Sequence, residues 1–154
     1  MQPLWQLPAT QLVAGFRDGS LTPVDVLQAV LARMDEVNPR LNAVVARHDE
    51  AVLAQAQAAT QRFAQGRPLS MLDGLPFTVK DSLFTVALPT TCGTAALRDH
   101  RPTHDELAAG RALAGGALLI GKTNVPEFAN DGYTANPLFG VTGNPWCVDS
   151  HTRR

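Results

Sequence analysis

The feature that most constrains the fold is an uninterrupted apolar run, Ala117-Leu118-Leu119-Ile120, between glycines at positions 116 and 121. A strand with no polar position is buried on both faces of its sheet. Such a strand needs other layers of structure above and below it. We therefore expect an α/β fold with a mixed or parallel sheet.

A second strand and an intervening helix complete the pattern. The apolar segment Leu75–Val79 ends at Lys80-Asp81, and residues 105–113 have helical character ending at Gly115-Gly116. A strand, a helix and a strand in this order form a βαβ unit with parallel strands. The sequence therefore predicts that residues 67–146 begin an α/β core.

Residues 1–66 are predicted to be mainly helical. The clearest start signal is Thr22-Pro23, with Asp25 completing a capping box. The predicted elements of this part are a helix over Pro8–Asp18, a helix from Thr22 that ends at Asn38-Pro39, a strand within Leu41–Arg47, and a helix over Asp49–Gln65. From Asn124 we expect a short helix, and from Gly132 onward a loop.

Composition excludes several function classes. The 154 residues fit one domain or part of one, and 13 Lys+Arg against 14 Asp+Glu argue against nucleic-acid binding. No apolar run approaches the roughly 20 residues that span a bilayer. The first residues lack the pattern of a signal peptide, so we expect a cytoplasmic protein with no membrane partner. Cys92 and Cys147 are too few for a disulfide framework.

Lysine is rare in this chain: Lys80 and Lys122 stand against eleven arginines. A lysine can lose its proton when buried, whereas an arginine stays charged. Lys80 follows an apolar strand, which predicts that its stem enters the interior and that its desolvated amine can act as a general base. The alternative is a structural lysine paired with Asp81 at the strand end.

Two other chemistries are weaker. Residues 116–123, Gly-Ala-Leu-Leu-Ile-Gly-Lys-Thr, match the phosphate-binding expression G-x-x-x-x-G-K-[ST]. The four intervening residues favour a strand where that motif needs a loop, which argues against a nucleotide site. The spacing of Cys92, His100 and His104 matches no zinc pattern, so we expect no metal or cofactor.

Several motifs in order resemble the amidase signature family. Leu72–Asp81 resembles its lysine motif, and Leu88–Gly93, Gly121–Phe128 and Asn136–Trp146 resemble the landmarks that follow. The resemblance runs from about Gly19 to Trp146. It implies hydrolysis of C–N amide bonds by a lysine base, a bridging serine with a cis peptide bond and a serine nucleophile, with backbone N–H groups stabilising the oxyanion.

The resemblance also implies roles for particular residues. Lys80 matches the catalytic lysine, and Lys122 falls on a structural turn after the strand. Phe128, Ala129 and Asn130 lie on the segment that approaches the acyl part of the amide substrate. Pro126 before Glu-Phe favours a free-standing amidase over a component of an amidotransferase.

The resemblance breaks at the C-terminus. The family's Gly-Gly-Ser-Ser-Gly-Gly loop is absent, and Ser150 has no glycines around it. We therefore expect an N-terminal amidase fragment that carries only the lysine base and is inactive alone, with 147–154 a truncated or unrelated tail. The alternatives are a non-catalytic interaction module derived from an amidase and a nucleotide binder. An apolar strand at Ala117–Ile120 that lacks sheet neighbours would also promote self-association.

Overall fold

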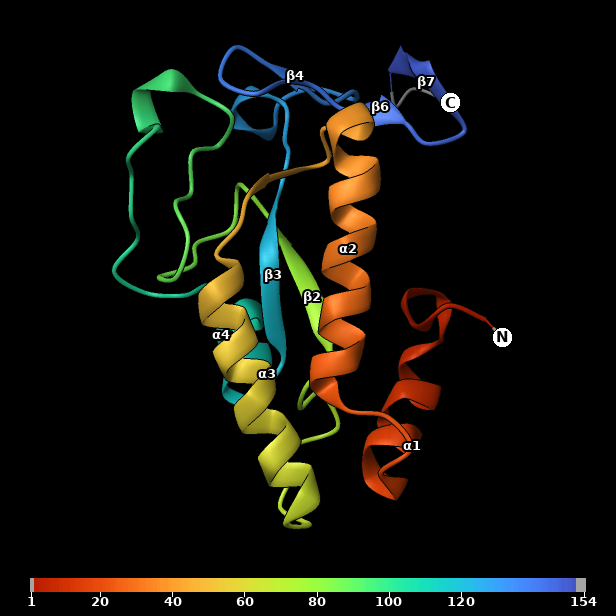
Figure 1. The fold of residues 1–154 in the computed structure, drawn as a ribbon. Helices are drawn as coiled ribbons and strands as arrows, with labels where there is room; N and C mark the ends of the chain where they lie inside the picture. Colours follow the sequence, from red (N-terminus) through yellow and green to blue (C-terminus); the bar gives the residue numbers. More distant parts are fainter. Residues whose placement is uncertain (1, 152–154) are drawn as a thin grey trace. The chain divides into compact units, whose positions relative to one another are not determined.

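The computed structural model describes residues 2–151 of the chain. The elements are η1 (Leu4–Gln6), α1 (Ala9–Asp18), α2 (Pro23–Leu41), β1 (Val44–Ala46), α3 (Asp49–Ala64), β2 (Pro76–Lys80), η2 (Ala95–Leu97), α4 (Leu107–Ala114), β3 (Leu118–Thr123), η3 (Glu127–Ala129), β4 (Ala135–Asn136), β5 (Gly140–Val141), β6 (Gly143–Asn144) and β7 (Cys147–His151) (Figure 1). Within this described range, no helix combines the length and apolar content that crossing a membrane requires.

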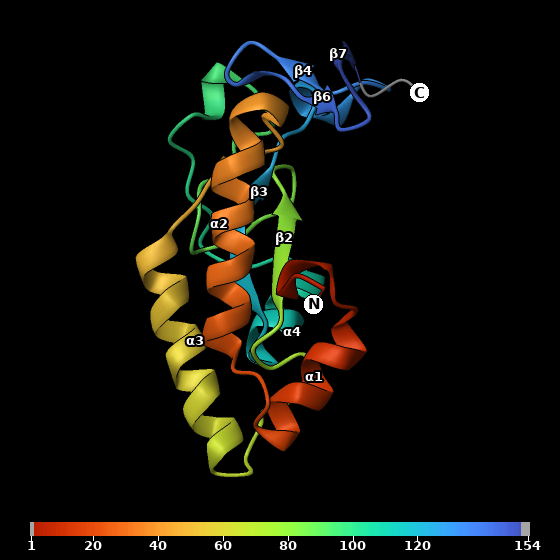
Figure 2. The ribbon, with the colours of Figure 1, turned by 45° about the vertical axis from the view of Figure 1, so that its right-hand side comes forward.

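The main sheet has the strand order β1-β3-β2. Leu118 N–H donates to Leu75 O at 2.8 Å, and Asp81 N–H donates to Thr123 O at 2.9 Å, so β2 and β3 advance in the same direction. With α4 between them in the chain, they form the predicted βαβ unit. Strand β1 pairs antiparallel with β3, which makes the sheet mixed. The expected α/β class is confirmed, and the two views in Figures 1 and 2 show β2 beside β3.

The chain forms two compact units from interleaved segments. The first unit comprises the chain up to Asp35, His48–Phe77 and Arg111–Ile120, and the second comprises Glu36–Arg47, Thr78–Gly110 and the chain from Gly121 onward.

The first unit has an apolar core built on α1, α2 and α3. Leu12, Phe16 and Val26 are buried at its centre, and the rings of Phe16 and Phe63 lie 5.3 Å apart. The predicted capping box is present, because Asp25 N–H donates to Thr22 Oγ1 and Thr22 N–H donates to the Asp25 carboxylate. Helix α2 therefore starts where the capping signals predict it.

A buried ion pair joins α3 to the turn before β2 in the same unit. The Asp73 side chain is fully buried and accepts bonds from Arg62 Nε at 2.9 Å and Arg62 Nη2 at 2.5 Å. It also accepts the Leu69 N–H at 2.9 Å. The pair raises the pKa of the Arg62 guanidinium, chiefly through the hydrogen bonds to Asp73.

The second unit is organised by amide side chains. Asn136 donates to Asn124 Oδ1 and Val125 O, and its own Oδ1 accepts the N–H groups of Leu138 and Phe139. A second group of bonds ties the same region to the segment before β1, since Asn42 donates to Phe139 O and its carbonyl accepts the Thr142 hydroxyl. Together these bonds order the segment after β3.

Two predicted helices differ from the structure for local reasons. Helix α2 continues through Pro39 to Leu41, and Asn42 N–H closes its last turn on Asn38 O at 2.7 Å. The predicted helix from Asn124 is a single 3₁₀ turn, because Phe128 adopts a left-handed conformation inside it. The Asn124 side chain bonds the loop instead of capping a helix.

The ends of the predicted helix and loop also change. Helix α4 begins at Leu107, two residues later than predicted, since Asp105 and Glu106 bond the preceding loop at Val86 and Phe84. The segment from Gly132, predicted as loop, contains the short strands β4 to β7, paired as two hairpin-like ladders.

Strand β3 lies between β1 and β2 in the sheet, but the two neighbours meet different parts of it. Leu118 bonds Leu75 on the β2 side, whereas β1 is in register with Lys122 and Thr123, beyond the apolar run. The expectation that Ala117–Ile120 lacks some of its sheet neighbours therefore stays a prediction. The outer strands of the β1-β3-β2 order are β1 and β2. One edge of this sheet therefore belongs to the strand that ends at Lys80.

Replacing the buried carboxylate should destabilise the protein. Asp73→Asn leaves the Arg62 cation without its partner, and we expect a loss of about 2 kcal/mol, since removing one member of a buried pair strands the other. Arg62 keeps some contact with water, which limits the loss. Urea unfolding at pH 7 measures it, and Asp99→Asn, at an exposed carboxylate, should change stability by less than about 0.5 kcal/mol.

The outer edge of β2 should support self-association. A lysine on an edge strand opposes strand-to-strand pairing, so Thr78→Lys at an exposed position of β2 should shift the population toward monomer. Sedimentation velocity across a concentration series reports the change. Thr103→Lys, the same substitution in an exposed loop, is the control. A chain that is monomeric at all concentrations before substitution would contradict the prediction.

Candidate active site

Lys80 is the last residue of β2, and its side chain is exposed. Successive side chains of a strand alternate between faces, and Val79 takes the buried one. The expectation from position alone, that the stem enters the interior, is therefore wrong in this chain. The backbone is fixed on both sides, because Lys80 O accepts the Leu83 N–H and the next residue, Asp81, bonds Thr123 O.

Asp81 is buried and does not serve as a surface partner for Lys80. Its carboxylate accepts the Thr91 N–H at 3.2 and 3.3 Å and the Thr91 hydroxyl at short range. Its carbonyl accepts the Cys92 N–H at 3.1 Å. The residue after Lys80 thus holds the Thr91-Cys92 segment, which the sequence places ten residues further along the chain.

The same segment reaches the predicted acyl-side residues. Cys92 O accepts the Phe128 N–H at 2.8 Å. Cys92, Phe128 and Ala129 all have positive φ, at 50°, 52° and 58°. Non-glycine residues in this region store about 1–3 kcal/mol each and cluster at functional sites. Hydrogen bonds therefore connect Lys80-Asp81, Cys92 and Phe128-Ala129 in one network.

Close backbone packing supports this network. Gly93 has φ +67°, and a Cβ there would come within 2.8 Å of Val125 O. A side chain at this position would push apart the 91–93 and 125–128 segments. The Phe128 ring is 63% exposed and Asn130 is exposed, so both are accessible to a bound molecule.

The structure changes the interpretation of Lys122. It lies within β3 opposite Ala46 of β1, rather than on a turn after the strand, and it is fully buried. Its Nζ donates to Leu83 O at 2.5 Å, Thr90 Oγ1 at 2.8 Å and Thr85 Oγ1 at 3.3 Å. Burial lowers its pKa from the ordinary 10.5, and the charge of Asp81 opposes that shift. The rarity of lysine was the one sequence signal for this site.

The apparent phosphate-binding motif is part of the same strand. Residues 118–123 form β3, and at Gly121 a Cβ would lie 2.6 Å from Val44 Cγ1 and 2.8 Å from Ala46 O. Glycine here allows close strand packing and provides no phosphate loop. Among residues 2–151, no three His, Cys, Asp or Glu side chains group as a metal site.

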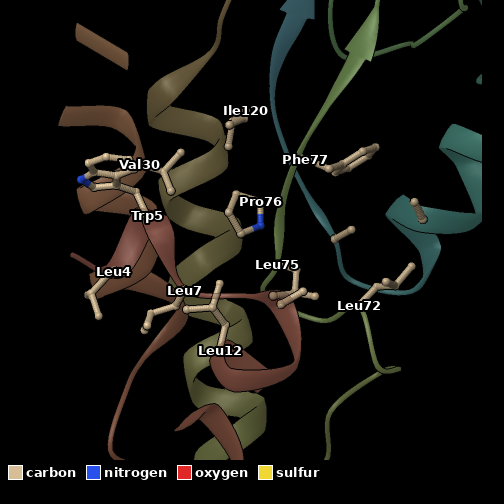
Figure 3. Close-up of a pocket in the computed structure, with 13 residues that line it drawn as sticks. Leu4, Trp5, Leu7, Leu12, Val30, Leu72, Leu75, Pro76, Phe77 and Ile120 are labelled. Atoms are coloured by element: carbon tan, nitrogen blue, oxygen red, sulfur yellow. The ribbon is translucent and has the colours of Figure 1, made fainter. Parts of the chain in front are cut away.

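A pocket of about 470 Å³ lies in the first unit (Figure 3). Its lining is almost wholly apolar and includes Leu4, Trp5, Leu12, Val30 and Phe77. It contains no titratable side chain and none of the predicted site residues. The pocket therefore lacks groups that could activate a nucleophile or a water.

A family model for amidases matches residues 25–151. The chain belongs to the amidase signature family. It is 40% identical over 147 residues to an indoleacetamide hydrolase of Bradyrhizobium diazoefficiens, covering 96% of this chain and 28% of that protein. It is 38% identical over 146 residues to a component of the glutamyl-tRNA(Gln) amidotransferase of Chloroflexus aurantiacus, covering 95% of this chain and 30% of that protein.

Solved amidase structures share the fold. A bacterial aryl acylamidase of the amidase signature family matches with a TM-score of 0.90 and 29% identity, covering 97% of this chain and 31% of that one. Peptide amidase from Stenotrophomonas maltophilia matches with a TM-score of 0.84 and 30% identity, and the match covers 95% of this chain and 31% of the peptide amidase chain. The chain thus spans about 30% of the length of these amidase relatives.

The buried lysine should make stability depend on alkaline pH. Because the folded pKa of Lys122 lies below 10.5, the unfolded chain binds more protons in the window between the two values. Its contribution therefore raises the free energy of unfolding as pH increases through that window. The raised pKa of Cys92, caused first by burial, acts in the opposite direction above pH 9.0.

A Cys92→Ser background removes that opposing effect. In this background we expect the free energy of unfolding to rise with pH from the lowered folded pKa of Lys122 up to the ordinary 10.5. The rise should disappear on Lys122→Met. Urea unfolding over the pH series measures both slopes. Equal slopes with and without Lys122 would contradict a lowered lysine pKa.

Proposed function

We propose that this chain is the lysine-bearing part of an amidase signature hydrolase, with Lys80 as its general base. The observation that supports it is the hydrogen-bonded network in which Lys80-Asp81, Cys92 and Phe128 are joined. The rigid backbone around Lys80 leaves the amine as the accessible group at the end of β2. A positioned base of this kind contributes about 10²–10⁴-fold to a rate.

The proposed mechanism divides the work between this chain and a segment bearing two serines. Lys80 would take a proton through a bridging serine, so that a second serine attacks the amide carbonyl. A lysine serves as a base when it is uncharged, which requires a covering segment that keeps water from the amine. The exposed Lys80 of this chain has no such cover among the described residues, so we propose that the chain alone is inactive.

The substrate is proposed to be a linear amide whose acyl part meets Phe128, Ala129 and Asn130. The exposed Phe128 ring offers an apolar surface for that part. The left-handed backbone at Phe128 and Ala129 sets the direction of this surface. We propose a free-standing amidase rather than a component of an amidotransferase, on the weight of Pro126, and a cytoplasmic location without nucleic-acid or membrane partners.

A chimera tests the proposal. This chain replaces the 147 matched residues of the Bradyrhizobium indoleacetamide hydrolase, and hydrolysis of indoleacetamide is measured by ammonia release. We expect the chimera to hydrolyse the amide and Lys80→Met to lower kcat by about 10³-fold. The isolated chain should match buffer. Arg98→Met, the same change at an exposed cation, should have little effect.

The outcomes separate the alternatives. Activity that survives Lys80→Met would refute the assignment of the base. A chimera that is folded by circular dichroism but inactive would favour a non-catalytic module derived from an amidase. Turnover by the isolated chain would require another nucleophile, with Cys92 and Ser150 as the residues to substitute first.

A further inference from the structure

Lys122 is the largest fully buried side chain of the described residues, and the proposed mechanism gives it no role. Its three donor bonds go to Leu83 O, Thr85 Oγ1 and Thr90 Oγ1. An ammonium group has three N–H donors and no acceptor, so these partners satisfy it completely. Burying such a charge is costly unless it is bonded in this way.

The two hydroxyls are oriented to accept from the lysine. Thr85 donates its own hydrogen to Leu88 O at 3.3 Å, and Thr90 donates to Leu83 O at 3.2 Å. Each hydroxyl oxygen therefore presents a lone pair to Lys122 Nζ. A neutral amine would leave its own lone pair facing two oxygens that have no hydrogen to give. The arrangement is built for the charged form.

The charges that face this group agree with that assignment. Burial lowers the pKa of Lys122, and the carboxylates of Asp81 and Asp105 oppose that shift by favouring the positive form. Cys92 is the third titratable group that acts on Lys122, and it favours the positive form only when it is a thiolate. Three acceptors that converge on one point also suit an ammonium better than a planar guanidinium, whose five donors are spread over a fork. This explains a lysine here in a chain in which eleven of the thirteen Lys and Arg residues are arginine.

The three acceptors belong to one loop, and that loop is anchored at Lys80. Leu83 N–H donates to Lys80 O at 2.9 Å, so the loop starts at the carbonyl of the proposed base. Its far end, Thr90, adjoins Thr91, which holds the Asp81 carboxylate. Lys122 thus joins the two ends of the 83–90 loop, at Leu83 and Thr90, and both ends adjoin residues that bond Lys80-Asp81.

We propose that Lys122 is a positioning residue for Lys80, acting as a buried cation that closes the 83–90 loop and so fixes the Lys80-Asp81 backbone at the end of β2. The catalytic meaning of this role rests on the proposed function of Lys80. The contacts themselves do not, so the loop closure can be tested without any hydrolysis.

The test uses hydrogen exchange and lysine labelling on the 154-residue chain. In Lys122→Met, the amide hydrogens of Asp81, Thr91 and Cys92 should exchange about tenfold faster or more, as expected for the loss of bonds to a charged group. Those of Gly74 and Leu118 in the first unit should change only with global stability. Protein labelled with ¹⁵N-lysine gives two backbone signals, one each from Lys80 and Lys122. In Lys122→Met the Lys80 signal should shift from its position in the unsubstituted protein. In Lys122→Arg it should not return to that position.

Controls keep the result decisive. Val52→Ala removes buried apolar contact in the first unit and should lower stability without the local effect at residues 81, 91 and 92. If Lys122→Met does not fold, Thr90→Val and Thr85→Val, each removing one acceptor, should give the same local pattern more weakly. Uniform acceleration at all amides, or an unmoved Lys80 signal, would overturn the proposal.

Failure of the two proposals can be told apart. Suppose that the amides of residues 81, 91 and 92 exchange faster in Lys122→Met, but Lys80→Met does not change the activity of the chimera. The assignment of Lys80 as the base would then be refuted, and the role of Lys122 in loop closure would stand. Unchanged exchange with a chimera that depends on Lys80 would refute the role of Lys122 alone.

Discussion

The buried carboxylate of Asp81 is the interaction on which the second unit depends. It stands directly after β2, accepts two groups of Thr91, and lies in a region that also buries the Lys122 cation. Each charge is fully hydrogen-bonded, as buried charges must be. Because the carboxylate belongs to the residue after Lys80, whatever holds Asp81 also holds the end of β2. Polar contacts of Asp81 and Lys122 therefore hold the first part of the irregular stretch that follows β2.

The regular elements followed from the sequence because local patterns determine them. The capping box at Thr22 and Asp25, the apolar strand at Leu118–Ile120 and the βαβ order all appear where spacing predicts them. The end of α2 and the extension of β3 did not. At the end of α2, the bond from Asn42 N–H to Asn38 O carries the helix past Pro39. Strand β3 extends because β1 lies beside Lys122 and Thr123, and such a pairing leaves no local signature.

The site shows the same division. Sequence motifs select Lys80, Phe128, Ala129 and Asn130 as candidates, but they do not predict how the segments that carry these residues are connected. The connection runs through Asp81, Cys92 and a pair of left-handed residues. No sequence pattern marks these residues as connected, because a strained backbone conformation is maintained by the surrounding structure. The family membership supplies the order of the motifs, and the hydrogen bonds supply the geometry.

The contrast between the two lysines has a practical consequence. One ε-amine is exposed at the end of β2 and the other is enclosed in β3. An amine-reactive dye would therefore attach at one side chain, apart from the chain's N-terminal amine. A dye at that position would sit where the proposed covering segment would bind, and a change in its emission would report that binding before any chemistry takes place.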